Sequence, residues 1–426
     1  MNAPAAHGGA PDARDRNRAL LAVALVNFAG MAGFGTLFPI LPQYGLAIGA
    51  SATQIGLALA AFSIGQLLAG ARVGALSDRF GRRPVLLWSL ALTAAFSAAT
   101  AFCTTPLALI VVRLFGGCAS GSFGVTFAVA ADVTAPRDRA AAMARVGAGL
   151  SLGFILGPAV GGLIAGPSAE PADFARVCLA SAGLSLLAFF ATLALLPETS
   201  PPSAATPAGA APGAGATSVA TDASAGGGSP RLGTRRLLHD ARVARLTWLG
   251  LLASAAVATM EASFPLFAST AFKAGPSTIG FVFGAMGIIS TVLQLAGTGP
   301  ATQRFGNERV MLAGLALQCA GLGLLGIAAS FGTAIGGMLF IAIGFAFLNP
   351  AISSLASLAG PAVAQGEVLG LQQSAGALGR IAGPTIGGAL FDGFGGNAPF
   401  LFGALAMLVT AIYAGRTTPR EEAAAG

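Results

Sequence analysis

The sequence contains few charged residues, and this shortage argues against a soluble globular protein. Asp, Glu, Lys and Arg make up only 9% of its 426 residues, whereas a soluble chain would have roughly a quarter of its residues charged. Hydrophobic residues account for 55% of the chain, and the mean hydropathy is +0.78. The long apolar runs also lack the alternation of polar and apolar residues that a membrane β-barrel requires. An α-helical membrane protein is therefore expected.

Residues that carry chemistry in enzymes are scarce as well. Neither of the two histidines, His7 and His239, lies in an apolar run, so neither is expected to relay protons across a membrane. The four cysteines lack metal-ligand spacing and fit small buried hydrophobic residues instead: Cys103, Cys118, Cys178 and Cys319. No nucleotide-binding loop and no nucleophile paired with a base is found in the sequence. We expect no enzymatic activity, no metal and no cofactor.

Long apolar runs recur along the whole chain, and each is long enough to cross a bilayer as a helix, which takes about 20 residues. Twelve such runs can be counted, at residues 19–42, 53–75, 84–103, 106–131, 143–165, 174–196, 244–270, 278–299, 310–329, 333–357, 367–391 and 397–415. They predict an all-α integral membrane protein with twelve transmembrane helices.

Two segments repeat the same pattern in the two halves of the chain. Gly153–Gly162 and Gly379–Gly388 both read G-x-x-x-G-P-x-x-G-G, and a second pair, Gly74–Pro84 and Gly299–Arg309, lies at nearly the same offset. Because 61 residues are glycine, a single G-x-x-x-G would mean little, but matches in register indicate a duplication. We therefore expect two pseudo-symmetric six-helix bundles, the arrangement of a transporter whose halves rock against each other.

The repeated glycines are expected to pack helices. Those spaced by four residues fall on one helical face and let a neighbouring backbone approach closely, while the proline bends the helix. The predicted packing residues are Gly153, Gly157, Pro158, Gly161 and Gly162 in the first copy, and Gly379, Gly383, Pro384, Gly387 and Gly388 in the second.

The positive charges predict the orientation of the chain. Most of the 23 Lys and Arg residues fall on one side of the predicted helices, and only Arg176 and Lys273 fall on the other. The positive-inside rule places the charged side, with both termini, in the cytoplasm. The net charge of +7 therefore reflects topology, and we expect no nucleic-acid partner. The predicted organisation is a tail at 1–18, a bundle at 19–199, a flexible linker at 200–243, a bundle at 244–415 and a tail at 416–426.

The segment Gly74–Pro84 reads G-A-L-S-D-R-F-G-R-R-P and joins predicted helices 2 and 3. It resembles the signature loop of the major facilitator superfamily, whose aspartate closes the cytoplasmic gate in the outward-facing state by meeting the N-terminal end of helix 11. This resemblance implies that role for Asp78, whereas the second copy carries Gln303. The expected gating residues are Gly74, Asp78, Arg79, Gly81, Arg82 and Arg83, with Asp132 at the end of helix 4 as an acid common in the family.

Three charged residues lie deep inside apolar runs, where an unpaired charge costs at least a few kcal/mol. Arg113 resembles the helix-4 arginine that proton-driven members of the superfamily use in coupling, although Gly116 stands where glutamine is often found. Glu261 is the one carboxylate deep within an apolar run. Glu261 and Arg113 are the candidates for proton coupling; the alternatives are a structural ion pair for Arg113, and a role of Glu261 as the structural partner of Arg113 or Arg380. Arg380 could balance Glu261 or meet an anionic group of a substrate.

The motif Gly153–Gly162, in the fifth predicted helix, and the Pro197–Thr199 segment resemble those of the twelve-helix drug/proton antiporters, tetracycline exporters among them. Tetracycline exporters carry acids in helices 1 and 9, where this chain has Asn27 and Gln318, so export of metal–tetracycline by that scheme is not expected. The candidate residues for the substrate cavity are Asn27, Gln318, Asn349, Gln372 and Arg380.

Together these features predict a proton-coupled secondary transporter that exports small amphipathic compounds by alternating access. The alternative is a proton-coupled transporter of a native metabolite such as an amino acid or an organic acid. The proton gradient would supply the energy, and the partners would be a small-molecule substrate, protons and the lipid bilayer. We expect a monomer in a bacterial cytoplasmic (inner) membrane.

Overall fold

The computed structural model describes residues 13–135, 138–167, 170–199, 239–359 and 365–417. Most of the predicted tails, 1–18 and 416–426, and of the predicted linker, 200–243, lies outside these residues. All regular elements in the described part of the chain are helices. Within these described ranges, ten spans are long and apolar enough to cross a membrane, one of them formed by two consecutive helices over Pro106–Asp132.

The first half of the chain forms one bundle. Its helices are α1 (Ala13–Thr36), α2 (Leu41–Ala47), α3 (Ala52–Phe80), α4 (Arg82–Thr100), α5 (Pro106–Ala119), α6 (Phe123–Asp132), α7 (Arg139–Ala165) and α8 (Pro171–Leu195).

The second half forms the other bundle. Its helices are α10 (Ala241–Phe272), α11 (Pro276–Ala296), α12 (Thr298–Phe305), α13 (Asn307–Gly326), α14 (Phe331–Ala359), α15 (Gln365–Phe394) and α16 (Ala398–Thr417). Each of the twelve predicted apolar runs coincides with one long helix or with a pair of consecutive shorter ones. The expected all-helical membrane fold is confirmed, and the helices are compatible with the predicted count of twelve.

Several helices extend beyond the apolar runs. Helix α1 begins at Ala13, before the predicted boundary at residue 19, and Arg18 pairs with Asp15 at 3.8 Å in its first turns. Helix α10 begins at Ala241, because the carboxylate of Asp240 accepts hydrogen bonds from the backbone amides of its first turn. Hydropathy marks the part of a helix that fits the hydrocarbon, and polar turns continue the helix into the interface.

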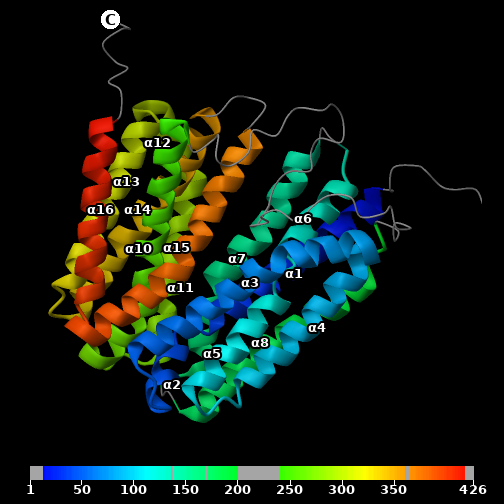
Figure 1. Ribbon diagram of the computed structural model, residues 1–426, viewed down its shortest axis with the longest axis horizontal. Helices are drawn as coiled ribbons and strands as arrows, with labels where there is room; N and C mark the ends of the chain where they lie inside the picture. Colours follow the sequence, from blue (N-terminus) through cyan, green and yellow to red (C-terminus); the bar gives the residue numbers. More distant parts are fainter. Residues whose placement is uncertain (1–12, 136–137, 168–169, 200–238, 360–364, 418–426) are drawn as a thin grey trace, which may run out of the picture.

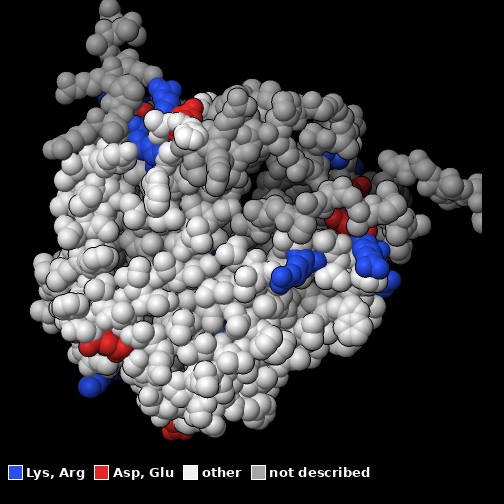
Figure 2. Space-filling view, in the orientation of Figure 1, with Lys and Arg blue, Asp and Glu red and all other residues white. Residues whose placement is uncertain are grey.

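The two bundles lie side by side, and the molecule has two distinct ends (Figure 1). One end carries the start of α1, the end of α16 and the short helix α12, and is called the termini end; the opposite end carries α2 and is called the α2 end. Charged side chains gather near these two ends, and the band between them is almost free of charge (Figure 2). This distribution fits an apolar belt between two polar membrane interfaces.

Glycines with positive φ form two equivalent tight turns at the termini end. Gly81, with φ of 97°, separates α3 from α4, and Gly306, with φ of 81°, separates α12 from α13. Only glycine adopts this backbone conformation without strain. The duplication therefore includes the backbone of this turn, in addition to the sequence pattern.

Candidate functional site

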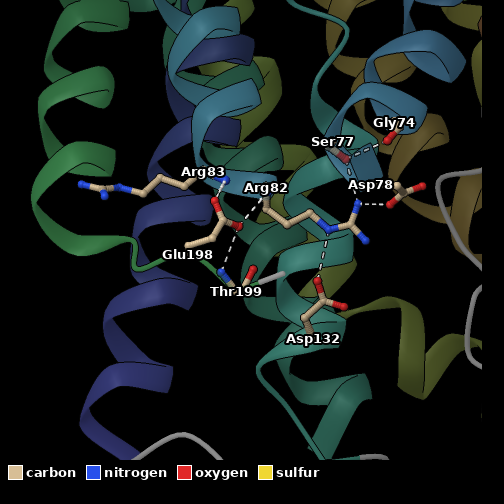
Figure 3. Close-up of polar contacts among 8 residues, drawn as sticks. All are labelled: Gly74, Ser77, Asp78, Arg82, Arg83, Asp132, Glu198 and Thr199. Atoms are coloured by element: carbon tan, nitrogen blue, oxygen red, sulfur yellow. Dashed lines mark hydrogen bonds and ion pairs between the residues drawn. The ribbon is translucent and has the colours of Figure 1, made fainter. Parts of the chain in front are cut away.

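Arg82 is the centre of a polar cluster at the termini end of the first bundle (Figure 3). Its guanidinium donates to the carboxylate of Asp78, to the hydroxyl of Ser77 at 2.7 Å and to Asp132 at 3.1 Å. These partners come from α3 and α6, so Arg82 at the start of α4 ties three helices together. Asp78 is still 66% exposed. The predicted gating residues Asp78, Arg82 and Asp132 are thus brought together within one bundle.

Glu198 belongs to the same cluster, although its position in the sequence gave no indication of this role. Its carboxylate, beyond the end of α8, accepts hydrogen bonds from the backbone amides of Arg82 at 2.9 Å and Arg83 at 3.3 Å (Figure 3). Gly81 has no side chain with which to cap α4, and a carboxylate at a helix N-terminus is favourable. Glu198 therefore caps α4 from another helix.

We expect Glu198→Gln to destabilise the attachment of α8 to α4 by about 0.5 kcal/mol, since the charge that complements the helix dipole is lost. The measurement is the thermal unfolding of the detergent-solubilised protein. Thr199→Ala is the matched control on the neighbouring residue, because the hydroxyl of Thr199 has no hydrogen-bond partner among the residues that the structure describes. Equal stability of Glu198→Gln and the wild type would contradict the cap.

Arg113 lies in the interior of the first bundle and is 4% exposed. Its guanidinium carbon lies 4.5 Å from the ring centroid of Phe62 and 5.6 Å from that of Phe34. Its Nε and Nη2 atoms have no hydrogen-bond partner in the described part of the chain, and a cavity of about 10 Å³ adjoins the side chain. That volume suffices for about one water. Cation–π contacts with Phe34 and Phe62 therefore stabilise Arg113. The sequence alone did not identify these two rings as its partners.

Glu261 and Arg380 are opposite charges of the second bundle that interact electrostatically. Glu261 is half-buried in α10, and it interacts electrostatically with Arg380 of the neighbouring helix α15. Arg380 is exposed although it lies well inside α15. Of the two partners considered for Glu261, the structure brings it together with Arg380, while Arg113 lies against the two phenylalanine rings.

The other polar residues predicted to line a cavity have different surroundings. Asn27 is fully buried, donates to the carbonyl of Val146 at 3.2 Å and accepts from Thr126 at 2.8 Å, so its amide joins α1 to α6 and α7. Gln318 is also buried, and both polar atoms of its amide are without a hydrogen-bond partner among the described residues. Asn349 is exposed and Gln372 is half-buried.

The glycines spaced by four residues pack the helices within each bundle. In the first copy, a methyl group at Gly157 would lie 2.8 Å from the carbonyl oxygen of Ala32 in α1. In the second, a methyl group at Gly383 would lie 2.5 Å from the carbonyl oxygen of Ala255 in α10. Both distances are too short for a Cβ, so the motif allows α7 to touch α1 and α15 to touch α10.

The last glycine of each motif faces the opposite bundle. A methyl group at Gly162 would lie 2.9 Å from the Cα of Gly280 in α11, and one at Gly388 would lie 2.7 Å from the Cα of Thr53 in α3. Adjacent residues on a helix point about 100° apart, so consecutive glycines serve different neighbours. Each motif therefore joins its helix to a partner within its own bundle and to a helix of the other bundle.

Hydrogen bonds also connect the bundles at the α2 end. The amide of Gln43 donates to the carbonyl of Ala274 at 3.3 Å, and the backbone amide of Ser277 donates to the carbonyl of Gly166 at 3.1 Å. Asp392, near the end of α15, accepts hydrogen bonds from the first turn of α3. The helices of the two bundles separate toward the termini end (Figure 1). The molecule is thus joined at the α2 end.

Comparison with known proteins agrees with this architecture. A family model described as Major Facilitator Superfamily matches residues 23–272 and 246–426. Multidrug resistance protein 2 of Bacillus subtilis is 27% identical, with 90% of each chain covered, and the class C tetracycline resistance protein of Escherichia coli is 29% identical, covering 88% of this chain and 90% of its own.

A solved structure of a bacterial homologue of the human lysosomal transporter Spinster, inward-facing and occupied, superposes with a TM-score of 0.76. It is 13% identical and covers 96% of this chain and 98% of its own, so the likeness extends to the fold alone.

Proposed function

The chain belongs to the Major Facilitator Superfamily, and on that premise we propose that it is a proton-coupled secondary transporter that exports small amphipathic compounds by alternating access. The observation that carries this proposal is similarity along nearly the whole chain to resistance proteins for multiple drugs and for tetracycline. The structural relatives are transporters as well, in agreement with the prediction that the chain is a transporter and not an enzyme.

The contacts between the bundles support alternating access. With both termini in the cytoplasm, as the positive charges predict, the α2 end faces the outside of the cell, and the molecule is in an inward-facing state. The gate at the α2 end is closed by backbone contacts across Gly162 and Gly388. At the cytoplasmic end, Asp78 is bonded to Arg82 of its own bundle, which fits an open cytoplasmic gate. A bacterial inner membrane is the proposed location.

Glu261 is the proposed proton carrier, because it is an intramembrane carboxylate with a cationic neighbour in Arg380. Protonation of Glu261 would remove its electrostatic attraction to Arg380, and loss of the proton would restore that attraction. One proton entering down 100 mV provides about 2.3 kcal/mol, enough for a roughly fifty-fold gradient of a neutral compound. Arg113, the second candidate, is held in a separate place in the first bundle.

Transport of a native metabolite is the second candidate function. Arg113 is buried without an acidic partner among the described residues, and Arg380 is exposed beside Glu261. Arg113 and Arg380 carry two positive charges, and Glu261 balances one of them. The remaining positive charge would suit a substrate with an acidic group, such as an amino acid or an organic acid.

The test uses inside-out membrane vesicles energised by respiration, with internal acidity followed by a quenched pH dye. Antibiotics, dyes and neutral drugs are added one at a time to vesicles with and without the protein. We expect some of these compounds to release protons only where the protein is present. Release by metabolites in place of drugs would favour the second candidate, and no release by either panel would contradict proton-coupled transport.

A further inference from the structure

Asp392 completes the N-terminal cap of a helix in the other bundle. Its Oδ1 accepts from the backbone amide of Ala52 at 2.9 Å, and its Oδ2 accepts from the amide of Thr53 at 2.8 Å and the hydroxyl of Thr53 at 2.6 Å. Among the amides of the first turn of α3, the side chain of its capping residue Ser51 accepts from that of Gln54, at 3.2 Å. The first two amides of α3 therefore depend on a carboxylate from α15.

The equivalent contact in the other half of the molecule lacks a side chain. Under the duplication, Asp392 corresponds to Gly166 and Ser51 corresponds to Ser277. At that second junction, the carbonyl oxygen of Gly166 accepts from the amide of Ser277 at 3.1 Å. A backbone carbonyl is thus sufficient to join two helices at this end of the fold. The carboxylate of Asp392 is an addition that packing alone does not require.

Asp392 and Asp78 occupy reciprocal places on the same helix pair. Helices α3 and α15 run antiparallel and pack together. Asp78 lies in the last turn of α3, at the end where α15 begins, and Asp392 lies in the last turn of α15, at the end where α3 begins. A carboxylate is unfavourable at the C-terminal end of its own helix and favourable at the N-terminal end of another. Each acid is therefore placed to be stabilised by the opposite helix.

Among the described residues, Asp392 is the one of these two acids that contacts the opposite bundle. Asp392 makes three hydrogen bonds across the interface, whereas Asp78 is paired with Arg82 of its own bundle. We propose that Asp392 is the latch that holds the extracellular gate closed in the inward-facing state, as the counterpart of Asp78 at the cytoplasmic gate. This inference rests on the proposed alternating access. Rocking of the bundles would release one carboxylate as the other is engaged.

The test measures the opening of the extracellular gate directly. Spin labels are attached at Phe102→Cys and Ile327→Cys, two exposed positions in opposite bundles, after the four native cysteines have been replaced. Distances between the labels are measured by double electron–electron resonance in lipid, without substrate and without a pH gradient. We expect Asp392→Asn to increase the population with the longer distance by about tenfold, since hydrogen bonds to a charged group are the stronger ones.

Two further variants separate a latch from a general loss of structure. Thr53→Val removes the hydroxyl that donates one of the three hydrogen bonds to Asp392. This variant is expected to increase the population with the longer distance as well, but by a smaller factor than Asp392→Asn. Asp78→Asn combined with Asp392→Asn is expected to return the population toward that of the wild type. Glu170→Gln is the matched control, because this carboxylate lies near the same end of the molecule and caps its own helix, α8.

An unchanged distance distribution in Asp392→Asn, with normal amounts of protein in the membrane, would overturn the latch. The measurement needs no transported compound, so it is independent of the substrate. If the vesicles show no transport while the Asp392→Asn shift is present, the proposed function fails and the latch stands. If transport is found and the shift is absent, the latch fails and the proposed function stands.

Discussion

Vesicles that contain the Glu261→Gln variant are expected to show no compound-driven proton release above background. Glutamine keeps the size and the polarity of the side chain but cannot bind and release a proton, and an intramembrane acid is a functional residue by default. The quenched-dye assay measures this loss. In the same vesicles, exchange of labelled for unlabelled compound at equilibrium should continue, because exchange needs no net proton movement.

The matched control for this experiment is Glu308→Gln, since Glu308 lies in the first turn of α13 near the termini end, away from the bundle interior. Its proton release should equal that of the wild type. If Glu261→Gln loses both proton release and exchange, the carboxylate serves the structure or substrate binding, and its assignment as proton carrier is wrong. Unchanged proton release in Glu261→Gln would move the carrier to another group.

The general fold could be predicted from the sequence because membrane helices leave a strong local signal. A helix in hydrocarbon must satisfy its own backbone, so each span appears as a continuous apolar run, and the repeated glycine motif revealed the two bundles. The positive φ at Gly81 and at Gly306 follows from the same duplicated loop. These features depend on short stretches of sequence, and sequence patterns describe short stretches well.

The contacts of the candidate site were less predictable, because their partners lie far apart in the chain. Glu198 caps the helix that begins at Arg82, and Asp392 caps the helix that begins at Ala52. In each case the acid stands beyond or near a helix end with no local partner to reveal its role. Asn27 illustrates the opposite case: the sequence suggested a cavity residue, and the amide is engaged in the interior of a bundle. Sequence spacing identifies a polar residue within a membrane but does not reveal which helices surround it.

Substitution of Gly162 or Gly388 by leucine is expected to reduce export by about tenfold or more, while both bundles still fold, because each glycine lets backbones of opposite bundles touch. A methyl group at Gly162 would already lie 2.8 Å from the carbonyl oxygen of Pro276, and one at Gly388 would overlap the carbonyl oxygen of Ala52. A leucine side chain there would hold the extracellular gate open and remove the inward-facing state. The spin-label pair at Phe102 and Ile327 should then report the longer distance.

Substitution by leucine is expected to have a different effect at the glycines that face their own bundle. Leucine at Gly157 or Gly383 would enter the contact of α7 with α1 or of α15 with α10, so we expect these variants to fail to accumulate as folded protein, as judged by size-exclusion chromatography of the solubilised membrane. Gly147→Leu is the matched control on α7, since no described atom outside its own helix lies within 4 Å of a Cβ there. Normal export by both Gly162→Leu and Gly388→Leu would show that the gate tolerates a gap at this end, and would contradict closure by backbone contact.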